Sequence, residues 1–220
     1  MIIRKSDTVA DVILRNSALF SLGVKQITEQ IAERPAPTYI AMRQCGWFDK
    51  RFEARSVDGL TMGELDAIEQ HLPTLEHFEQ VLAVMLGLYR FNKVVNGIPD
   101  WTAGTMIDRA AVRRLRFIRA YRYFIEVEKQ LQAVGKAWKK LEMPKGKDAP
   151  SAIKRPNRGM QAVCREYIQL MQGAVTTAQA WNTPWPIVYE AFEDQKYKNL
   201  RQREDHERMK AKATGGRHRR

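Results

Sequence analysis

The fold of this chain is decided by residues 74–89, which read TLEHFEQVLAVMLGLY. Apolar side chains in this stretch recur at alternating steps of three and four, which is the spacing of one face of an α-helix. They are Leu75, Phe78, Leu82, Met85 and Tyr89. Further valine and leucine residues between them widen the apolar surface beyond one face. We therefore expect a helix that Thr74 caps, that extends to about residue 92 and that lies at the centre of the core.

The residues just before this helix predict another one. Thr61 and Glu64 have the spacing of a capping box, in which each side chain accepts a hydrogen bond from a free amide at a helix start. A short helix should therefore extend from about Met62 to His71, where Pro73 ends it.

The sequence before residue 61 is less regular. The first 34 residues predict one or two short helices, with Ser6 or Asp7 as the first cap. Residues 38–60 keep neither helical nor strand spacing, and we interpret them as irregular.

The second half of the chain predicts helices separated by proline-rich and glycine-rich breaks. After a turn at residues 96–100, helical spacing runs through residues 105–141 and again through residues 160–181. Thr183 followed by Pro184 indicates the start of a last helix. Few apolar residues follow Leu200, so the distal half of that helix should be solvated, and the tail from Thr214 disordered. The predicted fold class is mainly α: a multi-helix bundle with a long central helix, a basic linker and an extended C-terminal helix.

The net charge of +12 is distributed unevenly along the chain. Residues 1–101 contain 11 basic and 13 acidic side chains, residues 102–160 contain 15 and 5, and residues 161–220 contain 11 and 7. We therefore divide the chain into a weakly acidic helical region at 1–101, a basic helical region at 102–200 and a charged solvated helix with its tail at 201–220. Within the basic region, residues 143–159 combine prolines with lysine and arginine, which is typical of a mobile linker.

Several function classes receive no support from the residues. The longest apolar run is about half the roughly 20 residues that cross a bilayer, so no membrane segment is expected. Cys45 and Cys164 stand in no metal-ligand pattern, which favours a reducing compartment. His71 and His77 are six residues apart across a proline, which is the wrong spacing for a metal site on one helix face. No phosphate-binding loop or nucleophile elbow is present, so we expect no catalytic residues, no metal and no cofactor.

Basic side chains are the first group of candidate functional residues. On a helix across residues 105–141, Arg109, Arg113 and Arg116 should form a cationic ridge on the side opposite the apolar stripe. The linker adds Lys145, Lys147, Lys154, Arg155 and Arg158, and the tail adds Arg217, Arg219 and Arg220. Together these could neutralise phosphates of a polyanion, although arginine and lysine also cover the solvated faces of most helices.

Aromatic and apolar side chains at the start of the last helix are the second group. Trp185, Val188, Tyr189 and Phe192 lie in its first turns and are candidates for binding another protein. Trp181 and Trp185 bracket a turn, and such aromatics are more often buried in the joint between two helices.

Three segments carry a resemblance to a known family: residues 60–69 (LTMGELDAIE), residues 78–87 (FEQVLAVMLG) and residues 183–192 (TPWPIVYEAF). The first two resemble small helical phage morphogenesis proteins, and the third is similar to the closing helix of phage tail assembly chaperones. This resemblance implies a non-enzymatic role in which the chain shields an aggregation-prone tail protein, such as the tape measure, during assembly. The basic linker departs from the pattern of that family.

Two hypotheses about function therefore remain open. In the first, the chain is an assembly or scaffolding protein that binds a tail or other virion component through apolar residues of the helix at 74–92 or of the helix at 185–200. In the second, its basic second half binds DNA or RNA. The expected location is the cytoplasm, that of the host if the chain is phage-encoded, or the virion. The residues do not predict an oligomeric state.

Overall fold

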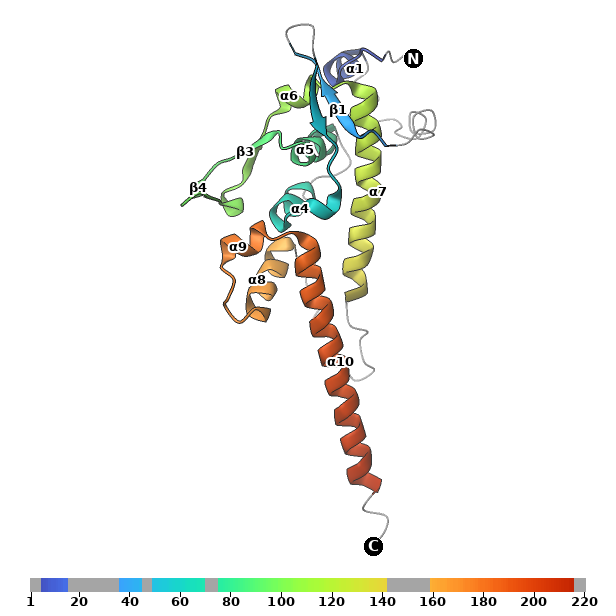
Figure 1. Ribbon diagram of the computed structural model, residues 1–220, viewed down its shortest axis with the longest axis vertical. Helices are drawn as coiled ribbons and strands as arrows, with labels where there is room; N and C mark the ends of the chain where they lie inside the picture. The colour runs from blue at the N-terminus through green and yellow to red at the C-terminus, as the bar shows by residue number, and fades with distance from the viewer. Residues whose placement is uncertain (1–4, 16–35, 45–48, 70–74, 142–158, 216–220) are drawn as a thin grey trace.

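The computed structural model describes residues 5–15, 36–44, 49–69, 75–141 and 159–215 (Figure 1). Over these residues the chain is mainly helical, with a few short strands, which confirms the predicted fold class. The described parts of the chain contain no helix whose length and apolar character would let it cross a bilayer. The predicted linker at 143–159 lies outside the described residues except for Gly159, and the end of the tail, 216–220, lies outside them altogether.

The helix predicted as central is α5, Leu75–Met85, and every side chain from Phe78 to Met85 is buried. It ends earlier than we expected. The amide of Gly87 donates to the Val84 carbonyl at 3.2 Å and that of Leu88 to the Ala83 carbonyl at 2.7 Å. Gly87 has a positive φ of 65°, which completes a Schellman motif. The predicted extension to residue 92 is therefore wrong.

An antiparallel arm replaces that extension. Strand β3, Tyr89–Phe91, pairs with β6, Thr105–Ile107, and beyond them β4, Val94–Val95, pairs with β5, Ile98–Pro99. Asn96 and Gly97 both have positive φ, as the tight turn of a hairpin requires, and this confirms the turn predicted at 96–100. The 3-10 helix η2, Trp101–Ala103, leads back to β6. We call residues 89–107 the arm, and in Figure 1 it projects sideways from the helices.

Helix α4, Met62–Glu69, begins with the predicted capping box. The Glu64 carboxylate accepts from the Thr61 amide at 2.9 Å, and the Thr61 hydroxyl accepts from the Glu64 amide at 3.2 Å. Helix α1, Val9–Arg15, has a similar arrangement, but Thr8 and Asp11 provide it. The predicted caps at Ser6 and Asp7 are thus wrong by one or two residues.

Residues 38–60, predicted to be irregular, contain two strands. Strand β1, Tyr39–Met42, pairs antiparallel with β2, Lys50–Glu53, and the 3-10 helix η1, Val57–Gly59, follows. Each strand has only four residues, which is too short for a period of two to stand out in the sequence. Contacts with distant segments decide this part of the fold.

The long helix predicted at 105–141 is interrupted. Residues 105–107 belong to β6, α6 covers only Arg109–Arg113, and α7, Phe117–Leu141, is the long helix. At the interruption, the Arg43 amide donates to the Arg114 carbonyl at 2.9 Å and the Arg116 amide donates to the Ala41 carbonyl at 2.8 Å. Residues 114–116 therefore pair with β1, and this tertiary pairing overrides the local helical spacing.

The remaining helices are α8, Met160–Leu170, α9, Thr177–Asn182, and α10, Trp185–Gly215. The single helix predicted at 160–181 is broken because Gln172 and Gly173 both have positive φ. Thr183 does not cap α10; its hydroxyl donates to the Gln179 carbonyl of α9 at 2.7 Å. The start of α10 is held instead by backbone bonds to the start of α4, from Trp185 to Leu60 and from Met62 to Thr183, each 3.0 Å.

One hydrophobic core joins these elements, and it includes side chains from Val9 to Val188. Core residues come from both sides of position 101. The predicted boundary there marks a change in net charge, and it does not divide the hydrophobic core into two units. Figure 1 shows α7 along one side of the molecule, and α10 extends away from the body toward the C-terminus.

Two helical glycines offer a matched test of this packing. A Cβ at Gly63 would overlap the indole of Trp101, whereas a Cβ at Gly135 would meet nothing. We expect Gly63→Ala to lower the free energy of unfolding by about 2 kcal/mol through overpacking. Gly135→Ala should raise it by about 0.5–1 kcal/mol through helix propensity. Urea unfolding followed by circular dichroism measures both, and equal effects of the two changes would contradict the packing of Trp101 on α4.

Candidate interaction surfaces

The residues predicted to bind a partner lie at the joint between α10 and the body. Val188 is fully buried, and Trp185 is buried with its indole Nε1 donating to the Val57 carbonyl at 2.9 Å. Tyr189 and Phe192 are half-buried, and both rings pack edge-on against Trp138 of α7. Trp185 and Val188 therefore anchor α10 in the core and are not available to a partner, which corrects the predicted role for these two residues; for Tyr189 and Phe192, which stay partly exposed, that role remains a prediction. Trp181 and Trp185 are both buried, as the burial interpretation expected.

The arginines of the predicted cationic ridge form ion pairs, although Arg109 and Arg113 remain exposed. Glu79 of α5 is only 1% exposed, and its carboxylate accepts from Arg113 Nε at 2.7 Å while Arg109 Nε lies 3.7 Å away. Arg116 lies beyond the end of α6 and forms a two-pronged ion pair with Asp49, with both bonds at 3.0 Å. Each of the three guanidinium groups thus faces a carboxylate. They do not form one continuous ridge, because the helix predicted at 105–141 is interrupted after Arg113.

The other candidates are distributed as follows. Lys145, Lys147, Lys154, Arg155 and Arg158, together with Arg217, Arg219 and Arg220, lie outside the described residues, as do Cys45 and His71. His77 Nε2 lies 2.8 Å from a Glu128 carboxylate oxygen. Cys164 is buried, and burial raises the pKa of its thiol to about 12. Within the described ranges no cluster of histidine, cysteine and acidic side chains could hold a metal ion.

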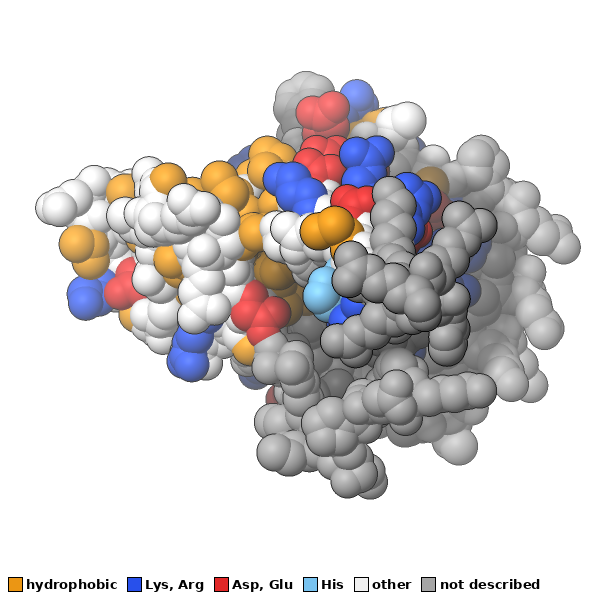
Figure 2. Space-filling view, turned by 90° about the horizontal axis from the view of Figure 1, so that it is seen from below, with side chains coloured by type: hydrophobic (Ala, Val, Ile, Leu, Met, Phe, Trp, Pro, Cys, Tyr) orange, Lys and Arg blue, Asp and Glu red, His pale blue; other side chains and the backbone are white. Residues whose placement is uncertain are grey.

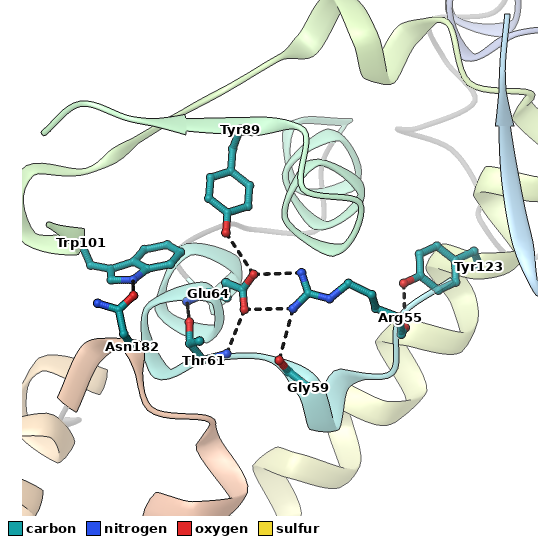
Figure 3. Close-up of polar contacts among 8 residues, drawn as sticks. All are labelled: Arg55, Gly59, Thr61, Glu64, Tyr89, Trp101, Tyr123 and Asn182. Carbon is teal, nitrogen blue, oxygen red and sulfur yellow. Dashed lines mark hydrogen bonds and ion pairs between the residues drawn. The ribbon is translucent and has the colours of Figure 1, made fainter. Parts of the chain in front are cut away.

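A polar network surrounds Glu64 (Figure 3). The spacing of Thr61 and Glu64 predicted only its capping-box hydrogen bonds. Its carboxylate accepts from Arg55 Nη1 at 3.0 Å and Nη2 at 3.2 Å, and from the Tyr89 hydroxyl at 3.0 Å. The Thr61 amide supplies a further bond. Arg55 also donates to the Gly59 carbonyl, and the Tyr123 hydroxyl donates to the Arg55 carbonyl at 2.7 Å. The network joins the start of α4, the base of the arm and α7.

The network has the properties of a structural anchor. Glu64 is buried, and its four hydrogen bonds occupy the acceptor positions that a reacting group would need. Burial also keeps its tyrosines protonated: it raises the pKa of Tyr89 well above the ordinary range, assisted by the Glu64 charge, and it raises the pKa of Tyr123 to about 12. A neutral hydroxyl can donate its proton to Glu64 or to the Arg55 carbonyl at every physiological pH.

The arm carries several exposed apolar side chains. Val94, Val95, Ile98 and Met106 are 55%, 45%, 41% and 67% exposed. We call these four side chains the apolar patch; they share the arm, with Val95 and Ile98 on one face of the β4–β5 hairpin and Val94 on the other. Among the described residues they make up four of the nine large hydrophobic side chains that are exposed, although the arm is a short segment. Figure 2 shows hydrophobic side chains at the surface on the side to which the arm projects.

The distal part of α10 is the other projecting element. All side chains from Arg201 to Lys210 are exposed, as the lack of apolar residues after Leu200 predicted. A helix of 31 residues is about 46 Å long, so most of its second half lies beyond the body. Basic and acidic side chains lie next to one another in the view from this end (Figure 2).

Comparisons with known proteins add no family to this picture. No protein-family model matches the chain, and neither a curated protein nor a solved structure does.

Two neighbouring residues at the start of α10 distinguish anchoring from partner binding. Val188 is fully buried, whereas Ile187 is 51% exposed. We expect Val188→Ala to lower the free energy of unfolding by about 2 kcal/mol, because it removes buried methyl groups and leaves a cavity. Ile187→Ala should change it by less than about 0.5 kcal/mol. Thermal and urea denaturation would measure this, and an unaffected Val188→Ala variant would show that α10 is not anchored there.

The raised pKa of Tyr123 predicts a specific pH dependence. The unfolded chain loses this proton near the ordinary pKa of 10, whereas the folded chain keeps it up to about 12. The stabilising contribution is therefore fully present below pH 10 and is lost as the pH rises toward 12, by roughly 2 kcal/mol. Tyr123→Phe should be less stable than wild type at neutral pH, and the difference should shrink in this window.

Urea unfolding at a series of pH values tests this expectation. The control is Tyr197→Phe at an exposed position of α10, whose curve should stay parallel to that of the wild type. A stability difference for Tyr123→Phe that remained constant through the window would contradict burial as the cause.

Proposed function

We propose that this chain is a non-enzymatic assembly or scaffolding protein that binds another protein through the apolar patch of its arm. The observation that carries this proposal is the concentration of Val94, Val95, Ile98 and Met106 on one projecting element. Exposed apolar side chains that gather in one place are typical of protein interaction sites, whereas scattered ones need no explanation. The binding surface is thus a different one from the start of α10, where we first expected it.

The arm is built to present this patch in a fixed position. Tyr89, Phe91 and Trp101 pack against one another with ring centroids 4.8–5.9 Å apart. The Trp101 indole Nε1 donates to the Asn182 side chain at 3.1 Å, and the Asn182 amide donates to the Pro99 carbonyl at 3.3 Å. These contacts fasten the arm to α9, so a partner would meet an ordered surface and less conformational entropy would be lost on binding.

The finer form of the proposal is a phage tail or virion morphogenesis factor. It draws on the resemblance of residues 60–69, 78–87 and 183–192 to phage morphogenesis proteins. In this role the partner would be a tail or other virion component, met in the host cytoplasm or kept in the particle. The projecting half of α10 would offer this partner a second, charged surface, since its acidic and basic side chains are all exposed from Arg201 to Lys210.

The sequence-based alternative, binding of DNA or RNA through the basic second half, has lost part of its support. Arg109, Arg113 and Arg116 face carboxylates, and the linker residues lie outside the described ranges. Of the residues predicted for such a contact, those of the linker and the tail remain candidates.

Site-specific photocrosslinking tests the proposed function. We expect a photoreactive amino acid placed at Val95 to crosslink the full-length chain, expressed in its native source, to one discrete protein that mass spectrometry can identify. The patch variant Val94→Asp with Ile98→Asp should reduce this adduct at least about tenfold, because a charge in an apolar contact costs more than about 1.4 kcal/mol.

The matched control is the same photoreactive residue at Gln132, an exposed position on α7. It should give no comparable adduct. The proposal fails if position 95 gives no adduct, or if positions 95 and 132 give the same set of proteins. A phage tail or virion component as the adduct would support the finer form, and an unrelated protein would contradict it.

A further inference from the structure

A second surface, independent of the arm, lies on β1, β2 and residues 114–116. β1 pairs with β2 on one side, with Ala41 opposite Arg51, and with residues 114–116 on the other, through the bridge from Met42 to Leu115. Side chains alternate between the two faces of extended strands. Ile40, Met42 and Leu115 are buried in the core. Tyr39 and Ala41 of β1 and Arg43, which follows it, therefore share the opposite face, on which the small side chain of Ala41 is also buried.

This opposite face gathers arginine side chains. The guanidinium carbon of Arg51 lies 4.8 Å from the centroid of the Tyr39 ring, and that of Arg119, from the first turn of α7, lies 4.2 Å from it. Arg43 follows on the same face by alternation, and it is exposed, as is Arg51. We call Arg43, Arg51 and Arg119 the arginine face. Arg114, also exposed, borders it, because its carbonyl accepts from the Arg43 amide.

The charge of the arginine face is not neutralised within the described residues. Two carboxylates belong to this face: Asp49 is occupied by Arg116, and Glu53 stands opposite Tyr39 in the strand register. Over the described part of the chain, none of the three arginines forms an ion pair with a carboxylate. This distinguishes them from Arg109 and Arg113, whose charges Glu79 compensates.

The Tyr39 hydroxyl reports the same positive potential. A hydrogen bond from Arg119 is the main cause that lowers the pKa of Tyr39; burial opposes it, and the charges of Arg119 and Arg51 add smaller lowering effects. Positive charge near a phenol favours its ionised form. An anion placed at this ring would meet the same field.

The chemistry of the side chains indicates which anion fits. A guanidinium packed on an aromatic ring is held in a plane and keeps its N–H groups free at the edge, where they match two oxygens of one phosphate. Neighbouring strands lie about 4.8 Å apart, and alternate residues of one strand lie about 6.7 Å apart. The guanidinium groups are therefore spaced so that each can contact a different phosphate of one nucleic acid strand. An aromatic ring beside cationic groups is also the composition of surfaces that bind nucleic acid without reading its sequence.

We propose that the arginine face binds the phosphate groups of a nucleic acid backbone, independently of base sequence. The contacts are charge-assisted bonds from Arg51 and Arg119, with Arg43 extending the site along β1. An acidic protein is the competing occupant, and the experiment distinguishes the two. This site differs from the predicted cationic ridge, and it draws residues from both halves of the chain.

Fluorescence anisotropy with the full-length protein and a labelled DNA of about 16 nucleotides, single-stranded or duplex, tests the proposal. We expect wild-type affinity to fall linearly with the logarithm of salt concentration. Arg51→Gln with Arg119→Gln should weaken duplex binding at least about tenfold at low salt and reduce the slope by about 1.8, because two phosphate contacts are lost. The control, Arg201→Gln with Arg203→Gln, removes the same charge from the exposed part of α10 and should bind within about twofold of wild type.

Three results would overturn the proposal. The first is a wild-type protein that fails to bind either DNA at low salt. The second is an equal loss of binding in both double variants, which would assign the effect to net charge alone. The third is displacement of DNA by polyglutamate at equal charge concentration, which would assign the surface to acidic proteins. Circular dichroism of both double variants verifies that they are folded, and the crosslink from the arm at position 95 should persist in Arg51→Gln with Arg119→Gln.

Discussion

Burial of α5 on every side is the constraint on which the rest of this structure depends. Eight consecutive side chains, Phe78 to Met85, are removed from water, so other elements must cover the helix around its whole circumference. One of the eight is Glu79, and a buried carboxylate is costly unless it is paired. Arg113 and Arg109 supply the pairing and thereby hold α6 against α5. The buried Glu79 carboxylate thus neutralises part of the positive charge in the second half of the chain.

Two anchors determine which elements can project from this body. The network around Glu64 fastens the base of the arm, because the Tyr89 hydroxyl of β3 donates to a carboxylate that also caps α4. Trp185 and Val188 fasten the start of α10 against η1, and Tyr189 and Phe192 pack on Trp138 of α7. Beyond these anchors the apolar patch and the distal half of α10 extend into solvent. The exposed apolar side chains of the anchored arm are the basis of the proposed assembly role.

Two groups of arginine side chains differ in whether a carboxylate neutralises them. Arg109 and Arg113 are neutralised by Glu79 of α5, and Arg116 by Asp49, which precedes β2. Arg51 and Arg119 lie beside the Tyr39 ring, and they and Arg43 have no such carboxylate partner among the described residues. Net charge alone does not distinguish these two sets, since it depends only on composition. The potential that a ligand meets depends on which guanidinium groups remain uncompensated at the surface.

The sequence by itself determined the mainly helical class, the capping box at Thr61, the central position of α5 and the solvated distal half of α10. These features follow from spacing within one segment. Tertiary structure alone decided that β1 and β2 form, that residues 114–116 interrupt the predicted long helix, and that Val188 is an anchor. It also decided which arginines are paired. The physical reason is that such contacts join residues distant in the chain, and local periodicity carries no information about a partner that folding brings from elsewhere.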